Sequence, residues 1–230
     1  LGDDLAGRRV VVSAGGTREP LDPVRFLGNR SSGRQGVALA VAARDRGADV
    51  VLVAAHLEVP SPAGVRVVPV STALEMSDAM ASEADDADVV IMAAAVADYR
   101  PVAVSAGKIK KEEAGDALSV ELVRNPDILQ RLASDAAVPR ADGTRRLVVG
   151  FAAETEEDPA ELLRIGRAKL ARKGCDLLVL NRVGWAEGFA TEGNTITVLG
   201  RSGDTLAEAS GSKEQVAHRI LDVVGAPTPQ

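Results

Sequence analysis

The chain alternates short apolar runs with segments of helical periodicity. Apolar runs of strand length cover residues 8–14, 49–55, 65–70, 88–95, 118–123, 146–150 and 176–180. Helical patterns cover residues 34–47, 71–84, 126–133 and 159–173. Repeated strand–helix units place parallel strands in one sheet with helices on both of its faces. We therefore expect an α/β fold of the Rossmann-like, doubly wound type with a mostly parallel sheet.

The C-terminal part departs from this alternation. Two apolar runs, 195–199 and 205–209, flank a loop that contains Gly200 and Gly203, which predicts an antiparallel β-hairpin before a last helix over 213–224. We expect one nucleotide-binding domain over residues 1–225 and a flexible tail over 226–230. The connection over 96–117 is rich in lysine and has little periodicity, which favours a lid or a binding loop.

Composition narrows the function. Hydrophobic residues make up 46% of the chain but aromatic residues only 2%, which disfavours a binder of single-stranded nucleic acid that stacks bases on rings. The formal net charge of −6 gives no reason to expect nucleic acid or a membrane as a partner. Cys175 lies in an apolar run and reads as an inert core thiol. We expect a cytoplasmic protein, and the missing initiator Met suggests a fragment of a longer polypeptide.

Two small-residue turns near the N-terminus predict a phosphate site. The first strand ends at Gly15, Gly16 and Thr17, and a second turn with Ser32 and Gly33 opens the next helix. Glycines let an anion approach the main chain, and a helix N-terminus attracts negative charge. The alternative interpretation is that both segments are only tight turns.

Further candidates follow three later elements. Asp98 comes after the small residues Ala93 and Ala94 at a strand end, where it can meet a ribose hydroxyl or a metal, or simply cap a turn. Lys108 and Lys110 point to one side of an extended loop, and the alternative for them is a solvated surface run. Asn125 is an acceptable helix N-cap.

Lys169 and Lys173 lie four residues apart near the end of a predicted helix. They either meet phosphates or complement the helix dipole. Other site types lack their signatures. The chain has neither the Gly-x-Gly-x-x-Gly pattern with its acidic residue nor a P-loop, and His56 and His218 have no partners at metal-ligand spacing.

Several ordered blocks closely resemble the bacterial phosphopantothenate-cysteine ligase family. They cover residues 13–25, 29–33, 93–100, 108–111, 125–128 and 150–155. The resemblance implies an enzyme that joins 4′-phosphopantothenate to L-cysteine with CTP and Mg²⁺, through an acyl-cytidylate, and that releases CMP and pyrophosphate. In bacteria this ligase is commonly fused behind a phosphopantothenoylcysteine decarboxylase, and FMN belongs to that preceding domain alone.

The resemblance also implies roles for individual residues. Lys108 is the expected catalytic cation, and Asn29 is expected to handle the acyl-cytidylate while the cysteine amine attacks. Independently of the resemblance, the position of Asp98 at a strand end makes it the candidate metal ligand. The family's dimers imply a homodimer with its active site near the subunit boundary. The expected nucleotide-binding residues are Gly15, Gly16, Thr17, Ser32, Gly33, Met92, Ala93, Ala94, Asp98, Lys108, Asn125, Pro126, Asp127, Ile128, Phe151, Lys169 and Lys173.

Two departures from the family pattern and two alternatives stay open. Arg30 stands where many relatives have His, and Arg34 and Gln35 replace a frequent Lys-Met pair. Arg25 and Arg30 are weak candidates for holding the phosphate of phosphopantothenate. The first alternative is an ATP-using relative of the same ligase, and the second is a regulatory module that binds nucleotide without turnover.

Overall fold

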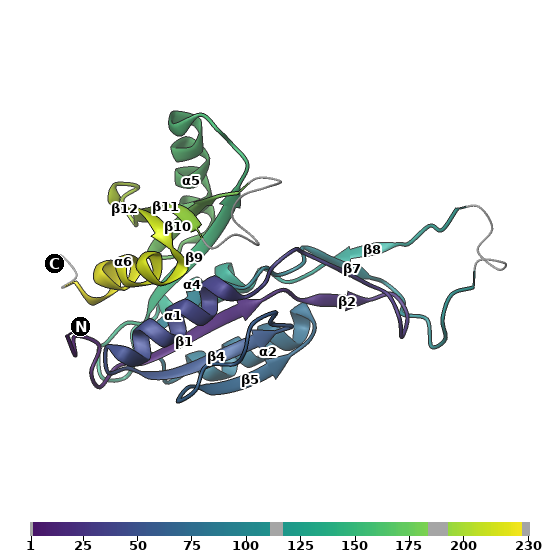
Figure 1. Ribbon diagram of the computed structural model, residues 1–230, viewed down its shortest axis with the longest axis horizontal. Helices are drawn as coiled ribbons and strands as arrows, with labels where there is room; N and C mark the ends of the chain where they lie inside the picture. The colour runs from purple at the N-terminus through teal and green to yellow at the C-terminus, as the bar shows by residue number, and fades with distance from the viewer. Residues whose placement is uncertain (1, 111–116, 184–192, 227–230) are drawn as a thin grey trace.

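The computed structural model describes residues 2–110, 117–183 and 193–226. Its centre is a sheet of eight strands (Figure 1). In spatial order the strands are β12 (Thr205–Ser212), β11 (Gly193–Gly200), β10 (Leu177–Arg182), β9 (Leu147–Glu154), β6 (Val89–Met92), β1 (Arg9–Gly15), β4 (Asp49–Ala55) and β5 (Arg66–Val70). All pairs from β10 to β5 are parallel, whereas β11 and β12 join antiparallel. The expected fold is confirmed, including the C-terminal hairpin.

Helices cover both faces of this sheet. On one side lie α1 (Arg34–Asp45) and α6 (Lys213–Gly225), and on the other lie α2 (Ala73–Ala84), α4 (Ile128–Ala136) and α5 (Pro159–Lys173). Alternate residues of β1 show why two layers form, since Val10 and Val12 belong to the first core and Val11 to the second. Strands buried on both faces need continuous apolar runs, which is the pattern of this sequence.

The sheet also fixes where a ligand can bind. From β1 the chain runs through α1 to β4 on one side, and it later continues with β6 on the other side of β1. This reversal of strand order opens a crevice at the carboxyl ends of β1 and β6, which is where ligands bind in open α/β sheets.

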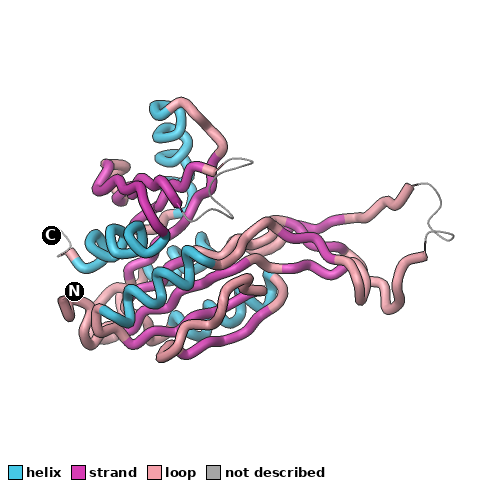
Figure 2. The backbone as a smooth tube through the Cα atoms, in the orientation of Figure 1, coloured by secondary structure: helices cyan, strands magenta, loops and turns pink. Residues whose placement is uncertain are grey.

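A second region, here called the arm, extends from this same edge of the sheet. It consists of two antiparallel ribbons, β2 (Arg18–Pro20) with β3 (Phe26–Gly28) and β7 (Tyr99–Pro101) with β8 (Leu122–Arg124), and the connections between these strands. Figures 1 and 2 show it projecting away from the end of the body where both chain termini lie.

The arm corrects the prediction for residues 118–123. The strand there covers only Leu122–Arg124, lies outside the main sheet, and is exposed at all three positions. Alternation of apolar and polar residues suits a ribbon with one face outward as well as it suits a buried strand, so the pattern alone misplaced it. Lys111 and the tail over 227–230 lie outside the described residues.

Two local boundaries also differ. β6 ends at Met92 rather than Ala95, because the Ala94 amide donates to the Ser13 hydroxyl at 3.0 Å and interrupts the ladder, which resumes only as an isolated bridge between Gly16 and Ala95. The expected N-cap Asn125 is wrong: Asp127 caps α4, its carboxylate accepting the Gln130 amide at 3.1 Å.

Candidate functional site

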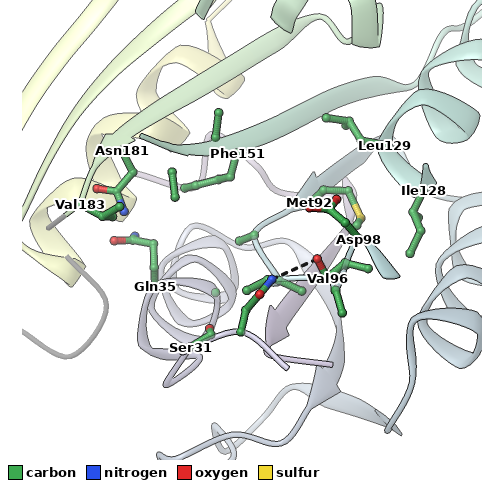
Figure 3. A pocket seen from close by; sticks show the side chains of 18 of the residues that line it. Ser31, Gln35, Met92, Val96, Asp98, Ile128, Leu129, Phe151, Asn181 and Val183 are labelled. Carbon is green, nitrogen blue, oxygen red and sulfur yellow. Dashed lines mark hydrogen bonds between the residues drawn. The ribbon is translucent and has the colours of Figure 1, made fainter. Parts of the chain in front are cut away.

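A cavity of about 2270 Å³ occupies the crevice at the carboxyl edge of the sheet. Its walls are the start of α1, the segment that follows β6, the start of α4, and the ends of β9, β10 and α5. Figure 3 shows side chains from the start of α1, the segment after β6, the start of α4 and the ends of β9 and β10 pointing into one space. A volume of this size holds a nucleotide together with a second substrate.

Most of the residues predicted for the nucleotide site, and the predicted catalytic Asn29, meet in this cavity. They are Asn29, Ser32, Gly33, Met92, Ala93, Ala94, Asp98, Asn125, Pro126, Asp127, Ile128, Phe151, Lys169 and Lys173. They come from stretches of chain more than a hundred residues apart, so the fold and not the sequence brings them together. Their contacts with a nucleotide stay a prediction.

Gly15, Gly16, Thr17 and Lys108 do not line the cavity. The amide of Gly16 donates to the Ala55 carbonyl at 2.9 Å, and the amide of Thr17 donates to the Ala95 carbonyl at 3.1 Å. The Thr17 hydroxyl accepts the Ala97 amide at 2.9 Å. This turn therefore holds the segment after β6 in place, which gives it an indirect part in shaping the cavity.

The start of α1 presents main-chain amides to the cavity. Gly33, at the N-cap, has φ 76°, and within the part of the chain described here no side chain caps this helix. A Cβ on Gly36 would lie 2.5 Å from that of Ala14, so a glycine is needed for the helix to approach β1 this closely. An uncapped helix start bordering a cavity favours an anionic ligand group.

Two lysines of α5 face the cavity, each paired with a carboxylate. Lys173 Nζ lies 2.5 Å from Asp127 Oδ2, and Lys169 pairs with Glu154. Asp127 thus serves both as the cap of α4 and as the partner of Lys173. Such pairs at a partly open site hold the ammonium groups in place, and a phosphate can compete for them.

Asn125 organises the opposite wall. Its side-chain amide donates to the Ala97 carbonyl at 2.8 Å, and its main-chain amide donates to the Asp98 carbonyl at 2.8 Å. The Arg100 guanidinium donates to its side-chain oxygen at 2.9 Å. These bonds fix the backbone at Asp98, whose carboxylate is exposed at the cavity.

Asn29 lies beside this wall. Its side-chain amide donates to the Val96 carbonyl at 3.2 Å, the dashed line in Figure 3. The bond fixes the orientation of the amide, which has a second hydrogen to donate. An oriented neutral donor of this kind is suited to a carbonyl oxygen on which charge develops.

Sequence reasoning missed a polar end of the cavity. Gln35, Asn181 and Val183 lie there together in Figure 3, at the start of α1 and the end of β10. Lys213 also lines it, 9% exposed, and burial together with the charge of Arg34 lowers the pKa of its ammonium group. They come from three elements, and the sequence marks only Gln35, as a departure from the family pattern, so the cluster appears only in the structure.

The described residues of the cavity do not form a metal centre by themselves. Among the residues that the structure describes, no group of three His, Cys, Asp or Glu side chains is placed to hold an ion. Asp98 fits Mg²⁺ in the way this ion binds with nucleotides, through one or two carboxylates together with phosphates and water.

Two simpler expectations can also be compared with the structure. Cys175 is buried, and burial raises the pKa of its thiol to about 11, which confirms the core assignment. Within the described ranges, no helix is long and apolar enough to cross a membrane.

Comparison with known proteins assigns the family. Residues 5–226 match the family described as the DNA/pantothenate metabolism flavoprotein C-terminal domain. The chain belongs to this family. It is 50% identical over 225 residues to the coenzyme A biosynthesis bifunctional protein CoaBC of Mycobacterium tuberculosis, a match that covers 96% of this chain and 53% of the relative. The chain therefore spans about half the length of the curated relatives it matches.

Solved structures agree with the fold. The C-terminal domain of a CoaBC protein superposes with a TM-score of 0.76 at 33% identity and covers 97% of both chains. A Cab2 mutant in complex with phosphopantothenate-cysteine superposes with a TM-score of 0.68 at 19% identity over 95% of this chain and 86% of that one, which shows a common fold. The family resemblance read from the sequence blocks is confirmed.

Proposed function

We propose that this domain is a CTP-dependent phosphopantothenate-cysteine ligase of coenzyme A biosynthesis. It joins 4′-phosphopantothenate to L-cysteine and releases CMP and pyrophosphate. One observation carries the proposal: in a member of this family, a single cavity gathers an uncapped helix start, two lysines and an oriented amide at the switch point of the sheet. The complex of a protein of the same fold with phosphopantothenate-cysteine supports the substrate class.

The first half-reaction activates the acid. A carboxylate oxygen of phosphopantothenate attacks the α-phosphorus of CTP, the bond to the β-phosphate oxygen breaks, and pyrophosphate leaves. Attacking and leaving groups are both anionic, so cations must surround the triphosphate. Lys169 and Lys173 lie at the cavity for this role once the phosphates replace their carboxylate partners.

The second half-reaction forms the amide bond. The amine of cysteine attacks the acyl carbon, the bond to the cytidylate oxygen breaks, CMP leaves with the bonding electrons, and the amine releases its proton to solvent. We assign the second amide hydrogen of Asn29 to the acyl carbonyl oxygen, because the Val96 carbonyl already fixes the first. A neutral donor stabilises this oxygen without adding a charge that would repel an ammonium ion.

Mg²⁺ accompanies the nucleotide in this proposal. It would be held by the phosphates and by Asp98, and it would supply positive charge for the leaving pyrophosphate. We assign FMN to a decarboxylase domain that precedes the ligase in a bifunctional protein, and no role to FMN in the ligase domain. We propose that this bifunctional protein acts in the cytoplasm.

The proposed role of Lys108 requires a second subunit. It lies on the arm, away from the cavity of its own chain, and the arm exposes many large apolar side chains. These are Val24, Phe26, Tyr99, Val102, Val104, Leu118, Val120, Leu122 and Val123. Apolar groups in this density favour burial against another surface. We therefore propose a homodimer in which the arm of one protomer brings Lys108 to the cavity of its partner.

Two assays test the proposed reaction. Pyrophosphate release is measured with phosphopantothenate and either CTP or ATP, and product formation is then measured after cysteine is added. The proposal expects faster release with CTP and a cysteine adduct. Equal or faster release with ATP would refute the choice of nucleotide. Tight CTP binding without any adduct would indicate the regulatory module instead.

A further inference from the structure

The turn over residues 21–25 is bonded to the loop that carries Lys108. We propose that this turn fixes the loop in the geometry needed for the first half-reaction, and that Asp22 is the positioning residue. The inference rests on the proposed function, because it concerns how Lys108 is presented. Asp22 lies on the arm and does not line the main cavity.

Asp22 accepts five hydrogen bonds, divided between its two oxygens. Oδ1 accepts the amides of Val24 and Arg25, both at 2.8 Å, which shape the turn itself. Oδ2 accepts the Ile109 amide at 3.1 Å and two nitrogens of the Arg25 guanidinium at 3.0 and 2.6 Å. One oxygen therefore builds the turn, and the other attaches the neighbour of Lys108.

Two more bonds complete the attachment. The Arg25 guanidinium donates to the Ile109 carbonyl at 2.8 Å. Asp22 therefore binds the main-chain amide of Ile109, and Arg25 binds its carbonyl oxygen. On the other side of Lys108, the Ser105 amide donates to the Leu21 carbonyl at 3.0 Å. The backbone is thus tied to one turn both before and after Lys108.

The burial of Asp22 indicates that this attachment does more than stabilise the ribbon of β2 and β3. Asp22 is only 3% exposed, and the Arg25 guanidinium holds the pKa of its carboxyl well below the usual range. Yet Gly107 and Lys108 beside it are exposed. The carboxylate of this ion pair is buried while the Arg25 side chain is partly exposed, so the pair contributes little to stability but fixes the local geometry, and catalytic groups need such support.

Asp22→Asn tests the roles of the two carboxylate oxygens separately. The asparagine oxygen can keep the bonds from Val24 and Arg25, whereas its amide nitrogen faces the Ile109 N–H and the guanidinium, which are also donors. The turn is retained, whereas the bond from the Ile109 amide and the ion pair that orients the Arg25 guanidinium are lost, which loosens the attachment. Asp142→Asn is the matched control, since that carboxylate is exposed and bonds only locally to Thr144.

A spin label reports the attachment independently of activity. A Cβ at Gly107 has no heavy atom within 4 Å, so Gly107→Cys accepts a nitroxide, and the native Cys175 is buried from the reagent. Asp22→Asn should increase the label's mobility while Asp142→Asn should not. Unchanged mobility in Asp22→Asn would overturn the attachment, whatever the activity.

Kinetics then test the catalytic part. Acyl-cytidylate formation should fall at least about tenfold in Asp22→Asn and stay at the wild-type rate in Asp142→Asn. If Asp22 acts through Lys108, adding Asp22→Asn to Lys108→Gln should cost nothing more, whereas a merely structural role would lower the rate again. The positioning role would be overturned if the losses of the two substitutions added in the double variant. It would also be overturned if the loop became mobile in Asp22→Asn while acyl-cytidylate formation kept its wild-type rate. Full activity of Lys108→Gln alone would refute the proposed role of Lys108, and with it the proposed purpose of the attachment. The mobility of the spin label would still show whether the attachment itself exists.

Discussion

The body and the arm of this molecule are stabilised in opposite ways. In the body, strands such as β1 and β6 are buried on both faces, and Val10, Val11 and Ile91 have no exposed area. In the arm, strands of three residues expose their apolar side chains and are held at the base by polar bonds. One of these bonds joins the buried Glu19 carboxylate to the Ala73 amide at the start of α2. The described part of the body buries its apolar side chains within one chain, whereas the arm leaves apolar side chains exposed, which the proposed dimer would cover.

The largest effect should come from the exposed end of the arm. Lys108→Gln removes one cation from the triphosphate, and acyl-cytidylate formation should fall by about a hundredfold or more, because such charges act mainly on the transition state. The melting temperature should not change, since Lys108 is exposed. Pyrophosphate release without cysteine measures the rate, and a wild-type rate would contradict the assignment.

Mixed dimers decide whether the arm acts on its own body or on the partner's. Lys108→Gln has a damaged arm and an intact cavity, while Asn29→Asp has the reverse. If Lys108 acts across the interface, a heterodimer contains one complete site, and a one-to-one mixture should regain about a quarter of the wild-type product formation. If each arm serves its own chain, the mixture should regain nothing.

A pair of truncations compares the two regions directly. Ile91→Ala in β6 should cost about 2–5 kcal/mol of unfolding free energy, because it leaves a cavity in a fully buried layer. Leu122→Ala in β8, where Leu122 is 43% exposed, should cost less than about 1 kcal/mol in the monomer but weaken self-association. Urea unfolding and sedimentation at several concentrations measure the two quantities. A monomer at every concentration in the wild type would remove the proposed dimer.

Asn29→Asp should separate the half-reactions. A carboxylate cannot donate to the acyl oxygen, so transfer to cysteine should slow by about ten- to a hundredfold and the acyl-cytidylate should accumulate. Quenched-flow analysis of the intermediate is the measurement. An equal loss in both half-reactions would show that Asn29 does not act selectively on the second.

The body is the part that sequence could predict, for physical reasons visible in single elements. Residues 50–55 form a continuous apolar run because both faces of β4 are buried there. Thr72 and Glu75 form the capping box that their spacing predicts, with the Glu75 amide donating to the Thr72 hydroxyl at 3.2 Å. Local rules suffice wherever burial and capping act over a few residues.

The arm and the polar end of the cavity follow no such local rule. β7 pairs Tyr99 with Arg124 across more than twenty residues, and its three residues are too few for a period to emerge. Gln35 and Lys213 meet because α1 and α6 pack side by side. The side-chain amide of Gln35 donates to the main-chain carbonyl of Lys213 at 3.2 Å. Contacts set by the packing of whole elements leave no signature in spacing.

The smallest predicted effect concerns the pH dependence of the arm. The folded-state pKa of Asp22 is held below its unfolded value by the Arg25 guanidinium, so its contribution to stability is complete above the unfolded pKa and declines as the pH falls toward the folded value. Asp22→Asn lacks this contribution at every pH. The difference in melting temperature between the two proteins should therefore narrow as the pH falls from about 5 to about 3, since the unfolded carboxyl titrates near 3.9. A difference that stays constant across this range would mean that the carboxyl is not selectively stabilised in the folded arm. The arm would then be held by its ribbons alone, and its contrast with the body would be one of apolar exposure rather than of polar attachment.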